Sequence, residues 1–187
     1  MFLCSGCGRF SAGGATHSHC ADRTPLTGLI ALYHYANPTV RGLIKEYKYH
    51  NAQEIEEPLE KLLLAGLLPL KRLVPEGVTV VSVPLHISRE RDRGFNQASR
   101  LGRFVAKGLG LEYSAPLKRT RKTFEQAKLS VPERAENCLQ AFVSQPVSGD
   151  FLLIDDVVTT GATFKAAAIA LKAAGADRIY ALAFAHG

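Results

Sequence analysis

The feature that most constrains the fold of this chain is the run Phe-Leu-Leu-Ile-Asp-Asp-Val-Val-Thr-Thr-Gly-Ala-Thr at positions 151–163. Its first four residues are continuously apolar, which is typical of a parallel strand covered on both faces. Asp155 and Asp156 follow at the carboxyl end of that strand, where open α/β sheets bind their ligands. The loop at 159–163 then leads into an alanine-rich helix through about Ala174. Hydroxyls, backbone N–H groups and a helix N-terminus therefore converge, which predicts an anion site beside two carboxylates.

Other phosphate-binding motifs fit this chain poorly. The sequence contains no Gly-x-x-x-x-Gly-Lys-Ser/Thr loop and no Gly-x-Gly-x-x-Gly after a strand, which disfavours nucleoside triphosphates and dinucleotides. The structural alternative is an ordinary strand-to-helix turn, in which Asp caps the helix and Thr satisfies its first N–H groups. A cap needs one such side chain and this loop supplies several, so we favour a binding site.

The run at 151–163 resembles the 5-phosphoribosyl-1-pyrophosphate (PRPP) signature of type I phosphoribosyltransferases, an apolar strand and two acidic residues before a Thr-Thr-Gly-x-Thr loop. The resemblance implies that the two carboxylates hold the ribose hydroxyls, that the loop wraps the 5-phosphate, and that Mg²⁺ binds with PRPP. The PRPP-binding residues expected on this basis, including two arginines from the middle of the chain, are Asp155, Asp156, Val158, Thr159, Thr160, Gly161, Ala162, Thr163, Arg89 and Arg91.

Three of the four cysteines fall within the first twenty residues. Metal binding explains this uneven distribution better than a disulfide framework does in a cytosolic chain. Cys4-x-x-Cys7 and His17-x-x-Cys20 share the same two-residue gap, so together they can close a tetrahedral site for a structural zinc ion.

Alternatives to this ligand set remain open at the level of sequence. His19 is the rival fourth ligand to His17, and Asp22 is a weaker one. The structural alternative to a metal site is a reduced N-terminus with incidental thiols. Cys138 lies far from the cluster and is expected to be a small core residue.

Downstream of the cysteines, helical and strand patterns alternate. Helical patterns cover about 40–47, 55–67 and 98–109, and strand patterns cover 78–83, about 112–117, about 139–143 and 178–184. Strands that alternate with helices predict an α/β fold with a parallel sheet. We expect a type I phosphoribosyltransferase-like sheet flanked by helices over residues 26–187, preceded by a zinc-binding knuckle over residues 1–25.

Charge and hydropathy narrow the partners. A net charge of +6 makes an anionic partner plausible, whether a phosphorylated metabolite or a nucleic acid. The apolar run near 62–70 is too short to span a bilayer and is bounded by Lys71 and Arg72. We therefore expect a soluble cytoplasmic protein with no membrane insertion.

A second set of motifs lies in the middle of the chain and upstream of it. Its members are Val83-Pro-Leu-His86, Arg89, Arg91, Arg93-Gly-Phe-Asn-Gln97, Arg119-Thr-Arg121, Gln126, Leu129, Arg134, Asn137 and Ala141-Phe142, with Tyr33 to Tyr49 upstream. Together with the signature and the knuckle, these motifs resemble, over nearly the whole chain, the ComF family of competence-associated phosphoribosyltransferase-like proteins. That family usually carries Cys-x-x-Cys twice, and here His17, an ordinary type of zinc ligand, stands where the third cysteine would be.

The resemblance implies transfer of a 5-phosphoribosyl group from PRPP to an acceptor that no residue identifies. It also implies a mobile loop carrying Arg119, Arg121 and Lys122, and a variable hood for the acceptor, here 33–35 and 47–50. These hood tyrosines could equally be packing residues. The expected catalytic residues are Asp155, Asp156, Arg121 and Lys122.

The alternative function is a non-catalytic, PRPP-responsive protein that binds single-stranded DNA in natural transformation, with proteins of the competence machinery as possible partners. Residues 86–134 contain twelve Lys or Arg and five Asp or Glu, a balance of +7. Guanidinium groups suit phosphate oxygens, although a solvated charged surface would have the same composition. The residues expected to contact nucleic acid are Arg89, Arg91, Arg93, Arg119, Arg121 and Lys122. Asn96, close to them, could instead cap a helix.

Overall fold

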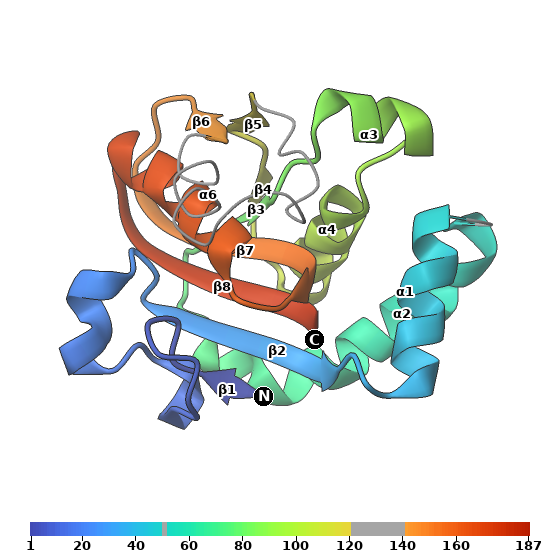
Figure 1. The fold of residues 1–187 in the computed structure, drawn as a ribbon, viewed down its shortest axis with the longest axis horizontal. Helices are drawn as coiled ribbons and strands as arrows, with labels where there is room; N and C mark the ends of the chain where they lie inside the picture. The colour runs from blue at the N-terminus through green and yellow to red at the C-terminus, as the bar shows by residue number, and fades with distance from the viewer. Residues whose placement is uncertain (50–51, 121–140) are drawn as a thin grey trace, which may run out of the picture.

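The structure is a computed structural model that describes residues 1–49, 52–120 and 141–187 (Figure 1). Its main element is a six-stranded sheet with the strand order β1-β2-β8-β7-β3-β4. Strand β1 is antiparallel to β2, and the other pairings in this sheet are parallel. The six strands are β1 (Phe2–Leu3), β2 (Gly28–His34), β3 (Thr79–Ser82), β4 (Tyr113–Ser114), β7 (Gly149–Val158) and β8 (Ala176–His186).

Helices connect these strands, and a small second sheet lies beside them. Strands β5 (Leu117–Arg119) and β6 (Phe142–Ser144) form an antiparallel pair. The α-helices are α1 (Pro38–Tyr49), α2 (Ala52–Leu67), α3 (Ile87–Arg93), α4 (Gln97–Leu109) and α6 (Ala162–Ala173). Short 3₁₀ helices are η1 (Ala12–Gly14), η2 (Ser18–Arg23) and η3 (Leu68–Leu73).

Strand β7 is buried on both faces, because its side chains alternate between two hydrophobic clusters. Phe151 and Leu153 pack in the cluster that includes Phe164 of α6. Leu152 and Ile154 pack in the other cluster, which draws its residues from α1, α2 and α4. The molecule is therefore layered, with α6 on one face of the sheet and α1, α2 and α4 on the other.

The expected fold class, α/β with a mostly parallel sheet between helices, is confirmed. The helices expected near 40–47, 55–67 and 98–109 correspond to α1, α2 and α4, and the strands expected at 78–83 and 178–184 correspond to β3 and β8. Asn96 caps α4, because its Oδ1 accepts a hydrogen bond from the Ala98 N–H at 3.0 Å. That capping role agrees with the alternative considered for Asn96.

Three features differ from the expectations. Strand β2 was not expected, because its last two residues, Tyr33 and His34, were assigned to a ligand hood. The segment at 112–117 is not one strand but parts of β4 and β5, which belong to different sheets. Strand β7 does not stop at residue 154, because its pairing with β8 continues to Val158 opposite His186.

The N-terminal residues join the main sheet directly. Phe2 of β1 lies opposite Ile30 of β2, and Ala15 forms an isolated antiparallel bridge with Gly28. Leu3 packs in the same hydrophobic cluster as α6. Among the described residues, no helix has both the length and the hydrophobicity needed to span a bilayer.

Burial of β7 on both faces predicts a large cost for truncating one of its side chains. Leu153 is 0% exposed, so Leu153→Ala should lower the free energy of unfolding by about 2–5 kcal/mol. Ile169→Ala, at a position of α6 that is 36% exposed, is the control and should change it by about 0.5 kcal/mol or less. Urea unfolding followed by circular dichroism measures the free energy of unfolding of both variants. Equal decreases in the two would contradict the burial of β7 on both faces.

Candidate functional site

The two carboxylates of the signature lie within the last part of β7. Asp155 is paired in register with Ala183 of β8, and both aspartates are partly exposed. The backbone N–H of Asp156 donates to Oδ1 of Asp155 at 2.9 Å. The long strand therefore holds both acidic residues on ordered backbone, one residue apart.

The loop after β7 turns sharply into α6. Gly161 is the N-cap residue with a φ of 74°, a left-handed conformation that favours glycine. A Cβ atom at Gly161 would meet no described atom within 4 Å, so the loop borders open space. Thr159 and Thr160 are exposed there, and Thr160 Oγ1 accepts a hydrogen bond from the Ala162 N–H at 3.4 Å. Exposed hydroxyls and the start of a twelve-residue helix thus meet beside the carboxylates.

Lys48, the second-last residue of α1, reaches this site from another element. Its Nζ forms an ion pair with Oδ2 of Asp156. Both side chains are largely enclosed, at 23% exposed for Lys48 and 15% for Asp156. Lys48 falls within the expected hood segment 47–50, but no separate role was expected for it, because local sequence does not show which residues α1 approaches in the fold.

The electrostatics of the acidic pair are asymmetric. Burial, and then the negative charge of Asp156, raise the pKa of the Asp155 carboxyl to about 8, although its hydrogen bond from the Asp156 N–H and the charge of Lys48 oppose the shift. Asp156 is the aspartate that pairs with Lys48. The raised pKa favours the protonated form of Asp155 at neutral pH.

Two of the tyrosines expected in the hood, Tyr33 and Tyr47, are packing residues. The Tyr33 hydroxyl donates to the Leu62 carbonyl oxygen at 2.7 Å, and its ring packs against Phe184 at 5.3 Å. Tyr47 is 2% exposed and packs edge-on against Phe95. The structural alternative considered for these tyrosines therefore describes both of them. Residues 50–51 lie outside the described residues.

The expected basic residues are spread over two elements. Arg89, Arg91 and Arg93 belong to α3, where Arg91 is exposed and the side chains of the other two lie outside the described part of the structure. Arg119 is the last residue of β5, not part of a loop as expected, and its guanidinium lies 5.2 Å from the centre of the Phe142 ring. Arg121 and Lys122 lie outside the described residues, as does Cys138.

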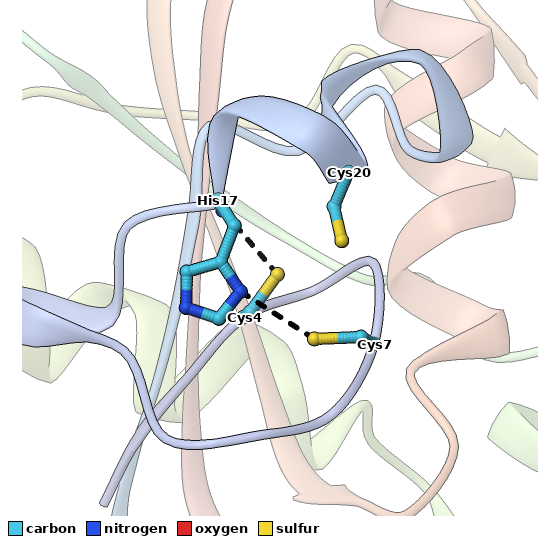
Figure 2. A group of neighbouring side chains, drawn as sticks. All are labelled: Cys4, Cys7, His17 and Cys20. Carbon is cyan, nitrogen blue, oxygen red and sulfur yellow. Dashed lines mark hydrogen bonds between the residues drawn. The ribbon is translucent and has the colours of Figure 1, made fainter.

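The structure brings the four expected metal ligands together at the N-terminus, as Figure 2 shows. The Sγ atoms of Cys4, Cys7 and Cys20 and a ring nitrogen of His17 all lie within 4.8 Å of one another. The Cys7 Sγ lies 3.5 Å from Nδ1 of His17, and the His17 N–H points to the Cys4 Sγ at 3.4 Å. Ligands of a tetrahedral zinc ion lie about 3.3–3.8 Å apart, so a small contraction would fit these four to the ion.

Tight turns hold the cysteines in place. A Cβ atom at Gly6 would lie 2.5 Å from the Cys20 Cβ, so the two halves of the cluster meet only because residue 6 is glycine. Cys4 and Cys20 are buried, and Cys7 is exposed. The ring of His19 stacks on that of His17 at 5.3 Å, but His19 is exposed and does not belong to the group of close ligand atoms.

The thiols of this cluster differ in acidity. Burial opposes ionisation of Cys4, but hydrogen bonds from the backbone of His17, Cys7 and Gly6 outweigh it and lower the pKa of Cys4 to about 6. Burial and the neighbouring Cys4 and Cys7 raise the pKa of Cys20 to about 11. A thiolate at Cys4 is the form that binds a metal ion.

Comparison with known proteins shows that most of the chain is similar in sequence to named proteins. It is 36% identical to DNA utilization protein YhgH of Escherichia coli strain K12 over 174 residues, which cover 86% of this chain and 74% of that protein. It is 29% identical to competence protein F of Haemophilus influenzae over 188 residues, which cover 94% of this chain and 81% of that protein. The chain belongs to the ComF family. No family model matches this ComF protein.

Solved structures with a weaker likeness were also found. Glutamine PRPP amidotransferase from B. subtilis matches 69% of the ComF chain, and 26% of its own chain, with a TM-score of 0.45 and 19% identity. Adenine phosphoribosyltransferase from Leishmania tarentolae matches 70% of the ComF chain, and 56% of its own chain, with a TM-score of 0.39 and 16% identity. Likenesses of this strength support no conclusion about a ligand or a reaction.

The raised pKa of Asp155 predicts how the stability of the fold depends on pH. Because the pKa of Asp155 is raised by folding, the protein takes up a proton when it folds, and the free energy of unfolding falls as pH rises from about 4 toward 8. Asp155→Asn mimics the neutral carboxyl, so without ligand it should raise Tm above pH 8 by at least about 2–4 °C and change it little at pH 5.

Asp150→Asn on the same strand is the matched control. Its carboxylate accepts a hydrogen bond from Arg178 Nε at 2.9 Å, which lowers the pKa of Asp150. That group stabilises the fold above about pH 4, so its amide variant should lower Tm at neutral pH. Thermal scans from pH 5 to 9 compare the variants, and a lower Tm for Asp155→Asn above pH 8 would contradict the burial of a neutral carboxyl.

Proposed function

We propose that this ComF protein binds PRPP with Mg²⁺ and transfers its 5-phosphoribosyl group to an acceptor, in a role connected with DNA uptake. The observation that carries the proposal is the convergence of two aspartates near the end of β7, the exposed residues Thr159 and Thr160, and the N-terminus of α6. Carboxylate oxygens accept hydrogen bonds from the two ribose hydroxyls, and N–H groups with hydroxyls hold a phosphate. A phosphorylated ribose fits both halves of this site.

The roles of individual residues follow from this chemistry. Asp155 and Asp156 would accept hydrogen bonds from the ribose hydroxyls. The 5-phosphate would be wrapped by residues 158–163. Arg89 and Arg91 of α3 would approach the pyrophosphate, and Arg121 and Lys122 would close over the ligand. Mg²⁺ bound with the pyrophosphate would neutralise the leaving group.

In the proposed reaction an acceptor atom attacks C1 of the ribose. The bond from C1 to the pyrophosphate oxygen breaks, pyrophosphate leaves with the electron pair, and the acceptor loses a proton. Positive charge would develop on the ribose ring in the transition state, and the carboxylate of Asp156 would stabilise it. Exclusion of water is needed, since water would otherwise take the place of the acceptor.

The N-terminal cluster is proposed to hold a structural zinc ion with Cys4, Cys7, His17 and Cys20. The donor set supports this, because three thiols and one imidazole fill a tetrahedral shell and leave no position for a substrate. Residues 1–25 would then act as a knuckle attached to the phosphoribosyltransferase-like domain of residues 26–187.

A second candidate function is binding of single-stranded DNA in response to PRPP, without catalysis. The relatives named for DNA utilization and competence favour it. The exposed Arg91 on α3 is one of the basic residues that would contact the DNA backbone. Such binding should weaken steeply with added salt.

Calorimetric titration with PRPP and excess Mg²⁺ tests the first proposal. The wild type should bind in a saturable manner, and Asp155→Asn/Asp156→Asn should weaken binding by at least about tenfold, since the lost hydrogen bond to the charged Asp156 alone contributes about 1.5–3 kcal/mol. Asp150→Asn, remote from the loop on the same strand, should bind like the wild type. If PRPP fails to bind while a single-stranded oligonucleotide binds at low salt, the DNA-binding function replaces the first proposal.

Zinc removal tests the knuckle. The purified protein should contain one zinc ion per chain, and a strong chelator should lower Tm by roughly 5–10 °C, because the metal stabilises only the folded cluster. His17→Ala should lose the ion, whereas His19→Ala, which removes the stacked neighbouring ring, should retain it. Metal analysis by mass spectrometry measures the content. If His17→Ala retained zinc and His19→Ala lost it, the fourth ligand would be His19 and not His17.

A further inference from the structure

The ion pair between Lys48 and Asp156 bears on which ligand the proposed PRPP site prefers, because the ammonium occupies one of the carboxylates. The Oδ2 atom of Asp156 is hidden from water and accepts no hydrogen bond from the described residues that meets geometric criteria. The ammonium of Lys48 is therefore the group that compensates its charge. A buried carboxylate that lost this partner would be left with a large desolvation cost.

The backbone of Lys48 is anchored by the packing of α1, whereas its side chain is long and unbranched. Val40, Ile44 and Tyr47 of α1 are all buried in the cluster on that face of the sheet. Tyr47 packs edge-on against Phe95, with ring centres 5.6 Å apart. This packing fixes where the Lys48 side chain starts, while its four-carbon stem can reposition the ammonium.

Another cation in the same neighbourhood is already engaged. Arg100 of α4 forms an ion pair with Glu56 of α2 at 3.4 Å and lies 4.3 Å from the centre of the Phe95 ring. It supports the packing around Tyr47. Lys48 is thus the cation that the structure places directly on the acidic pair.

The next step rests on the proposed function. When ribose hydroxyls donate to the carboxylates, they replace the ammonium as donors to Asp156. In PRPP the pyrophosphate is attached to C1, the carbon next to the one that bears the 2-hydroxyl. An ammonium released from Asp156 therefore has a stronger anion close by, to which it can donate charge-assisted hydrogen bonds.

We infer that Lys48 is a specificity-determining residue that moves from Asp156 to the pyrophosphate when PRPP binds. Ribose 5-phosphate has the same hydroxyls and the same 5-phosphate but no pyrophosphate. Its binding displaces the ammonium and gives it no new partner. The site consequently favours PRPP over ribose 5-phosphate, and part of that preference depends on a single lysine.

The test is a titration of both ligands, each with the same excess of Mg²⁺, into wild type and Lys48→Met. Methionine keeps an unbranched apolar stem and removes the charge. The affinity for PRPP should fall at least tenfold, whereas that for ribose 5-phosphate should stay within threefold or increase. The ratio of the two dissociation constants should therefore fall at least tenfold.

Two variants act as controls. Lys48→Arg keeps the positive charge and should retain the preference within about threefold. Lys45→Met makes the same change at an exposed position of the same helix and should leave the affinities for both ligands unchanged. Circular dichroism checks that all variants are folded.

Each other outcome overturns the inference in a recognisable way. Equal weakening of both ligands in Lys48→Met would make Lys48 a structural partner of Asp156 only. Tighter binding of both would make it a simple competitor. Binding of neither ligand to the wild type would overturn the proposed PRPP site, and the role of Lys48 with it, whereas wild-type binding with an unchanged ratio would overturn the role of Lys48 alone.

Discussion

The burial of β7 on both faces is the constraint on which the rest of the site depends. Four consecutive apolar residues anchor the strand between α6 and the α1, α2 and α4 layer. Because the strand continues past them to Val158, its two aspartates must lie on ordered backbone between these layers. Their desolvation raises the pKa of Asp155 and calls for a cation beside Asp156. Helix α1, which belongs to the layer on that face of the sheet, supplies that cation as Lys48.

Much of this arrangement follows from local sequence, and the rest does not. Continuous apolar residues predicted β7, helical spacing predicted α1, α2 and α4, and the matched two-residue gaps predicted which four residues gather at the N-terminus. Each of these signals is carried within a few neighbouring residues. The Lys48–Asp156 contact joins residues more than a hundred positions apart, so it depends on which helix covers which strand, and no local pattern contains that information.

The incorrect predictions also arise from contacts between residues far apart in the sequence. Strand β2 was missed because aromatic and basic residues at its end suggested a ligand hood, whereas tertiary packing uses the Tyr33 ring against Phe184 and its hydroxyl to satisfy the Leu62 carbonyl. Likewise 112–117 has a strand-like composition throughout but splits between two sheets. Composition indicates the propensity of a segment for extended structure, and only long-range pairing decides its partner.

The cysteine cluster and the carboxylates lie toward opposite ends of the parallel strands. Ala15, between the two halves of the cluster, bridges to Gly28 at the start of β2. The end of β2, at His34, is in register with His186 of β8, which lies opposite Val158 just after the carboxylates. A metal ion held by the cysteines would therefore act on the short edge strand β1 and the turns around it, not on the ligand. Strand β1 has only two residues at the open edge of the sheet, and a cross-link through a metal ion is a physical means of holding so short a strand in place.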